Sequence, residues 1–190
     1  MSSNRSEEAQ QAIESLLMDF VKTTRKITGH NPRLTPEDHF KDRLSSPAVT
    51  RNISTTEIEW VPKPHHDFNL FADLEKGLEI TIHDDLKAYY GAYWSEGICC
   101  QSEQGLVKLI QIWNQTDLEM LRENLLGHAF MKLKKKQALT LFFGLGEGDN
   151  ILTMDNANGH IYMEVPGRRP HRQLAENIAD YLRTLRVTLQ

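Results

Sequence analysis

Three glycines in the stretch FFGLGEGDN, residues 142–150, are the first candidates for chemistry, because glycine-rich loops can hold phosphate groups. A dinucleotide-binding loop has its glycines directly before a helix, whose N-terminus then faces the pyrophosphate. Gly144, Gly146 and Gly148 do not follow that spacing, and the residues after them, NILTMDNANGHIYMEV, are rich in strand formers. The sequence therefore predicts a hairpin loop here and not a phosphate site.

Eight histidines make a metal site the second possibility. Zinc sites use recurring spacings such as His-Glu-x-x-His or paired Cys-x-x-Cys, and neither occurs. Glu123 and His128 lie on one predicted helix and could exchange a proton with a substrate. A pair of this kind is more often a polar contact that fixes a helix against its neighbour. We therefore expect no metal, no cofactor and no enzymatic activity.

The two cysteines, Cys99 and Cys100, are adjacent and could bridge only through a strained ring. Two packed thiols in a reducing compartment are the expected state, and no second cysteine elsewhere could resolve a redox switch. The N-terminus has no apolar signal-peptide segment, and no apolar run approaches the ~18 residues of a membrane span. These features predict a protein of the cytoplasm.

The net charge of −4 is unevenly distributed. Residues 57–103 contain ten acidic side chains and three lysines, so this segment alone carries 3 − 10 = −7. An acidic segment disfavours nucleic acid and suits a basic partner. Two later segments, MKLKKKQ at 131–137 and GRRPHR at 167–172, are basic. The lysine run has no interleaved aromatic residues, and we interpret it as a helix C-terminus whose charges favour the helix dipole.

The elements that must position these groups begin with an amphipathic helix at residues 7–28, which has apolar residues at helical spacing. A polar, proline-containing stretch at 29–56 predicts a long irregular connection. The α+β core is expected at 57–190, so that the chain forms one domain over residues 1–190.

Within that core the pattern predicts a strand at EIEWVP, then a helix carrying Phe68, Phe71, Leu74 and Leu78, and a second helix capped by Asp84 or Asp85. Two strands follow at 97–114, and the capping-box sequence TDLE at 116–119 opens the next helix. ALTLFFG, NILTMDN and HIYMEV predict a three-stranded meander, and His171–Leu189 a final helix. This order indicates an α+β fold with a mostly antiparallel sheet.

Several of these segments resemble the Syd family, the SecY-interacting proteins of gamma-proteobacteria. The resemblance rests on LIQIWNQTDLEMLRENLLGH at 109–128, LTLFFG at 139–144, DNANGHIYMEVPGRR and LAENIADYL, together with ISTTEIEW in the N-terminal half. It covers about residues 10–188, whereas the stretch HDDLKAYYGAYWSEG is more acidic than in a typical member.

The resemblance implies a SUKH-like single domain that binds the cytoplasmic loops of the SecY translocation channel. It implies loose, indirect attachment to the cytoplasmic side of the inner membrane through SecY, and monitoring or negative regulation of unassembled SecY. No enzymatic activity or cofactor belongs to the family. The SUKH superfamily also contains immunity proteins that neutralise toxin domains, which leaves a different basic partner as the alternative.

Cytoplasmic loops of membrane proteins are rich in Lys and Arg, so an acidic receptor surface suits such a partner. Glu75 and Glu79 are four residues apart on one predicted helix, and Tyr90 and Trp94 have the same spacing on the next. We therefore expect a partner-binding surface within residues 57–103, made of Glu75, Glu79, Asp84, Asp85, Tyr90, Trp94, Glu96 and Glu103. The alternatives are a helix cap for one of the two aspartates and core packing for one of the two aromatic residues.

Overall fold

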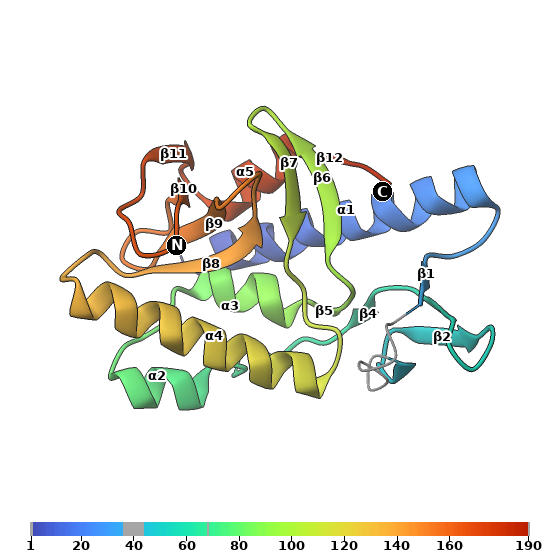
Figure 1. Cartoon of the computed structure of the whole chain (residues 1–190), viewed down its shortest axis with the longest axis horizontal. Helices are drawn as coiled ribbons and strands as arrows, with labels where there is room; N and C mark the ends of the chain where they lie inside the picture. The colour runs from blue at the N-terminus through green and yellow to red at the C-terminus, as the bar shows by residue number, and fades with distance from the viewer. Residues whose placement is uncertain (1, 36–43, 68, 190) are drawn as a thin grey trace.

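A seven-stranded antiparallel sheet organises the molecule (Figure 1), for which a computed structural model describes residues 2–35, 44–67 and 69–189. The strand order is β11-β10-β9-β8-β7-β6-β12. The strands are β6 (Ile98–Ser102), β7 (Gly105–Leu109), β8 (Thr140–Leu145), β9 (Ile151–Asp155), β10 (Ile161–Glu164), β11 (Arg172–Ala175) and β12 (Arg186–Val187). Each neighbouring pair is antiparallel, which confirms the predicted α+β fold and its 139–164 meander.

The described part of the chain has five helices: α1 (Ser2–Thr28), α2 (Ala72–Leu78), α3 (Asp84–Gly91), α4 (Gln115–Lys134) and α5 (Ile178–Thr184). The long α1 runs behind β6 and β7 in Figure 1 and packs against α3, α5 and β12. Helix α4 packs on β8, and α2 lies beside α4 at the bottom of the view. None of the helices within the described ranges is long and apolar enough to cross a bilayer.

The core between α1, α3, α5 and the sheet contains a chain of buried aromatic rings. Tyr89 meets Phe143 edge-on at 5.6 Å between ring centroids, and Phe143 meets Tyr181 in the same way at 6.1 Å. The hydroxyl of Tyr89 donates to the carbonyl of Ile110 at 2.9 Å, so its one polar atom is paired. Edge-to-face ring pairs add about 0.5–1.5 kcal/mol to the burial of their area. This cluster holds α3 and α5 on one face of the sheet.

A second, smaller sheet has the order β1-β3-β2, formed by β1 (Arg33–Leu34), β2 (Val49–Asn52) and β3 (Ile58–Trp60). The predicted irregular connection at 29–56 is therefore wrong where β1 and β2 lie, while residues 36–43 are outside the described residues. Both strands are short and mostly exposed, so they lack the apolar alternation that marks a strand. The sheet is fixed from beneath by Trp60, which packs against Phe20 and Trp113.

The predicted helix at 171–189 is confirmed only over Ile178–Thr184 and is wrong on either side of it. Its first part is strand β11, and α5 begins only at Ile178, because the Asn177 side chain caps it by accepting from the Asp180 amide. Leu185 is extended and leads into β12, which pairs with β6. Pairing with a strand far away in the sequence has overridden a local helical pattern.

Two caps differ from the prediction by one or two residues. Asn114, not Thr116, caps α4, and its side chain accepts from the Asp117 amide at 3.0 Å. His83, not Asp84 or Asp85, caps α3. A further antiparallel pair joins β4 (Lys63–Pro64), which precedes α2, to β5 (Tyr93–Trp94), which follows the end of α3 at Gly91. Phe68, the first apolar residue of the helix predicted before α3, lies outside the described residues.

Candidate partner-binding surface

The corner between α2 and α3 holds two of the predicted acidic residues around one lysine. Lys87 Nζ lies 3.0 Å from Asp84 Oδ1 and 3.3 Å from Glu75 Oε1. Burial opposes the charge on Lys87, but its two carboxylate partners raise its pKa overall. Glu75 also accepts from the Ile82 amide at 2.8 Å, while Glu79 is exposed at the C-terminal end of α2. Glu75 and Asp84 therefore hold the corner together, and Glu79 is exposed to a partner.

Two of the predicted surface residues are buried. The Asp85 side chain accepts from Ser6 Oγ and faces Arg5, which ties α3 to the start of α1. The Tyr90 hydroxyl donates to the Phe142 carbonyl at 3.0 Å, and burial raises the pKa of Tyr90 far above its ordinary value. The prediction that Asp85 and Tyr90 are surface residues is wrong, because both side chains are buried where α3 packs against the rest of the fold.

The remaining candidates do not form one patch. Glu103 is exposed in the turn between β6 and β7, at the top of Figure 1, whereas α2 lies at the bottom. Glu96 is half-buried just before β6. Trp94 lies in β5 and not on α3, because that helix ends at Gly91, so the expected four-residue spacing with Tyr90 on one helix does not exist. The predicted surface residues therefore lie in separate parts of the molecule and not in one patch.

Exposed carboxylates also lie on α4, which packs against α2, and they fall outside the acidic segment 57–103. Glu119 and Glu123 are exposed and four residues apart, so they share one side of α4. Between them Arg122 donates from Nε to the Leu70 carbonyl at 2.6 Å, which fixes the segment before α2 against α4. Asp73 is exposed in the first turn of α2. We call Asp73, Glu79, Glu119 and Glu123 the acidic strip.

A pocket opens at the N-terminal end of α4, where the same helix begins. It is lined by Ser45, Ser46, Pro47, Trp94, Asn114, Gln115 and Thr116. Trp94 contributes an aromatic wall and packs against the ring of His65, with 3.9 Å between ring centroids. Burial lowers the pKa of His65, which favours its neutral form. Trp94 is thus the one predicted aromatic residue that an approaching partner can touch.

The Glu123–His128 pair does not form, since Glu123 is exposed and His128 is buried on the opposite side of α4. His128 instead faces the sheet, with Nε2 3.5 Å from Glu164 Oε1. Lys132 Nζ lies 2.8 Å from Glu164 Oε2, and Thr140 Oγ1 donates to that same oxygen at 2.9 Å. The group is buried and ties α4 to β8 and β10. A Cβ at Gly127, one residue before His128, would meet no atom within 4 Å, so this glycine is not required by close packing.

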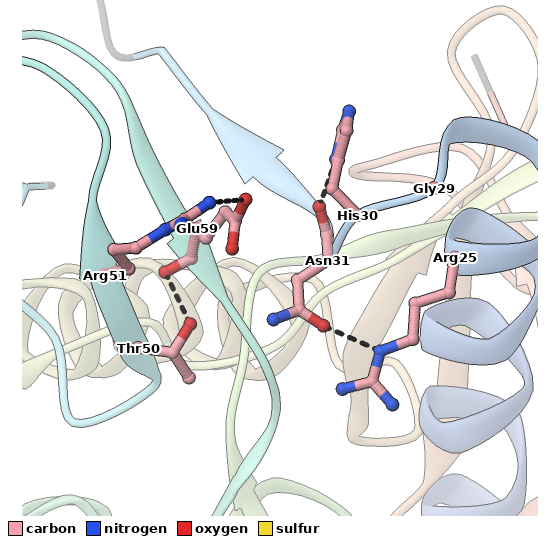
Figure 2. Close-up of a pocket in the computed structure, with 7 residues that line it drawn as sticks. All are labelled: Arg25, Gly29, His30, Asn31, Thr50, Arg51 and Glu59. Carbon is pink, nitrogen blue, oxygen red and sulfur yellow. Dashed lines mark hydrogen bonds and ion pairs between the residues drawn. The ribbon is translucent and has the colours of Figure 1, made fainter.

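Figure 2 shows a second polar pocket, between the C-terminal end of α1 and the small sheet. Arg51 donates to Glu59 Oε1 at 2.8 Å, and Arg25 donates from Nε to Asn31 Oδ1 at 2.7 Å. The hydrogen bond from Arg51 lowers the pKa of Glu59. Thr50 donates to the Glu59 carbonyl at 3.1 Å. These side chains bind one another, and the arrangement fastens β2 and β3.

The glycine loop is a hairpin between β8 and β9, as predicted. The Gly146 amide donates to the Asn150 carbonyl at 2.8 Å, and Gly148 has a φ of 63°. A strand and not a helix follows it. Across residues 2–35, 44–67 and 69–189, no group of three or more His, Cys, Asp or Glu side chains is placed to hold a metal ion.

The fold and surface define an α+β domain with exposed carboxylates on two adjacent helices. The family model described as Syd protein (SUKH-2) matches residues 10–186. A protein Syd of Hahella chejuensis is 43% identical over 178 residues, which are 93% of this chain and 93% of the relative. A protein Syd of Shewanella sp. strain MR-4 is 34% identical over 175 residues, covering 92% of this chain and 80% of the relative. The chain belongs to the Syd family.

Proposed function

We propose that this protein binds the basic cytoplasmic loops of the SecY translocation channel, and that the acidic strip is the main contact. Membership of the Syd family supports the partner. The choice of surface rests on one observation: four exposed carboxylates lie on two helices that pack side by side. Basic loops approaching such a strip gain favourable long-range electrostatics and orientation.

Glu75 and Asp84 add to this surface at its edge, although Lys87 offsets part of their charge. The pocket beside Trp94 lies at the start of α4, whose next turns carry Glu119 and Glu123. Aromatic side chains are enriched at the centres of interfaces. A partner loop lying along α4 would therefore meet an aromatic wall at one end and the acidic strip at the other.

In this proposal the protein works without enzymatic activity and without a cofactor. It is held at the cytoplasmic side of the inner membrane as a peripheral protein, with SecY as its receptor. Binding there would let it monitor or restrain SecY that is not properly assembled.

The experiment is co-purification of the tagged full-length chain with detergent-solubilised inner membranes that contain overproduced SecY. SecY should be retained at low salt and released as ionic strength rises, because exposed charge pairs are screened over about 8–10 Å near physiological salt. Absence of SecY at low salt would contradict the proposal. Capture of a basic toxin domain, with SecY absent, would favour the immunity-protein alternative.

A further inference from the structure

Two basic segments that are far apart in the sequence lie side by side in the fold. One is the end of α4 with the residues after it, 132–136, and the other is the loop 165–171 between β10 and β11. Lys132 Nζ donates to the Arg168 carbonyl at 3.1 Å, and Lys135 Nζ donates to the Gly167 carbonyl at 2.7 Å. In Figure 1 both segments lie on the left of the molecule. Two short basic runs thus become one surface.

This surface carries positive charge without opposing charge in its own segments. Residues 124–146 and 165–175 contain four lysines, three arginines and no aspartate or glutamate, in a chain whose net charge is −4. Lys132 is buried with Glu164, and the other six bases are exposed. We call them the basic face: Lys134, Lys135, Lys136, Arg168, Arg169 and Arg172.

Exposed apolar side chains lie next to the basic face. Phe130 is 55% exposed and Leu133 is 45% exposed, and they are three residues apart on the last turns of α4. The helix positions just before them, Ala129 and Lys132, are buried, so Phe130 and Leu133 point away from the core. Large apolar side chains beside clustered bases are typical of surfaces that enter the boundary between lipid headgroups and acyl chains.

We propose that the basic face, with Phe130 and Leu133, binds directly to the surface of an anionic phospholipid bilayer. Clusters of four to eight Lys and Arg residues are the size that anionic leaflets attract. The lysine run alone is at the lower limit of that range, and the arginine loop brings it within the range. A single-strand nucleic-acid surface would instead interleave stacking aromatic rings with its bases. This inference goes beyond the proposed function, in which SecY alone holds the protein at the membrane.

The test is co-sedimentation of the full-length chain with vesicles that contain no protein. The wild type should bind vesicles of phosphatidylcholine mixed with phosphatidylglycerol and should not bind vesicles of phosphatidylcholine alone. Raising the salt concentration should release it from the mixed vesicles. Arg168→Gln combined with Arg169→Gln should lower the partition coefficient roughly 30-fold, at about fivefold per charge. Phe130→Ser should lower the partition coefficient roughly tenfold. The exposed half of Phe130 would otherwise move from water into the apolar boundary of the bilayer, and serine loses that gain.

The matched control is Lys22→Gln combined with Lys26→Gln, which removes two exposed charges from α1. It should bind like the wild type, within about twofold. Equal losses in the two double variants would overturn the proposal, because net charge alone would then explain binding. Failure of the wild type to bind the mixed vesicles would also overturn it, as would binding to duplex DNA without binding to vesicles. Since these vesicles lack SecY, the outcome is independent of the proposed function.

Discussion

Lys132 Nζ lies 2.8 Å from Glu164 Oε2 between α4 and β10, with both side chains fully buried. Thr140 donates to the same carboxylate oxygen, and Lys132 also donates to the Arg168 carbonyl. The pair therefore joins the helix, two strands and the base of the arginine loop. A buried ion pair adds little stability over an apolar pair of the same shape, but removing one partner leaves an uncompensated charge.

Lys132→Met should lower the free energy of unfolding by about 3–5 kcal/mol, because Glu164 would keep its charge in the protein interior without a partner. Urea denaturation followed by circular dichroism measures this. Lys134→Met is the matched control, since Lys134 is exposed on the same helix, and it should change stability by less than about 0.5 kcal/mol. Similar values for the two variants would show that the buried pair does not hold the helix.

Stability should fall as the pH drops below about 6.5, partly through His128. Burial lowers the pKa of His128, Lys132 acts in the same direction, and Glu164 opposes them. Because the pKa is lower in the folded state, the unfolded chain binds a proton first, and the stabilisation present above the unfolded pKa is lost as pH falls. His128→Gln removes this titration. The variant should lose less stability than the wild type between roughly pH 7.5 and 5.5, and an equal or larger loss would exclude His128 as a source.

Gly159→Ala should destabilise the turn between β9 and β10 more than Gly148→Ala destabilises the glycine hairpin. Both glycines have positive φ, 79° and 63°, which costs about 1 kcal/mol for alanine. A Cβ at Gly159 would also lie 2.8 Å from the His83 ring, which caps α3, whereas a Cβ at Gly148 meets nothing within 4 Å. Thermal unfolding of both variants tests the difference, and equal losses would mean that the His83 cap is not affected.

The meander could be predicted because its strands are short and bounded by turn residues. The alternation in residues 139–164 and the Asn-Gly turn specify three neighbouring antiparallel strands without help from the rest of the chain. Strand β12 is different, since its two residues are a strand only because β6 offers a free edge. The spacing of apolar and turn residues therefore predicted the fold class correctly. It failed where pairing with a strand distant in the sequence determines the secondary structure.

The candidate surface was predicted in part for a similar reason. Glu79 and Trp94 lie where a partner can reach them, but Asp85 and Tyr90 are buried by contacts with α1 and β8. Those contacts join residues more than fifty positions apart, which charge counting along the chain does not detect. For the same reason the sequence did not indicate that the two basic segments lie side by side, where Lys132 and Lys135 join them.

The most direct measurement of the central claim is a binding titration against membranes containing overproduced SecY, at low and at high salt. Glu119→Lys combined with Glu123→Lys reverses two charges of the acidic strip. Glu7→Lys combined with Asp19→Lys reverses two exposed charges on α1 and is the matched control. The first variant should bind at least about tenfold more weakly than the wild type at low salt, with the difference shrinking at high salt. The control should bind like the wild type. Equal affinities for the two variants, or binding that does not respond to salt, would contradict an acidic receptor surface.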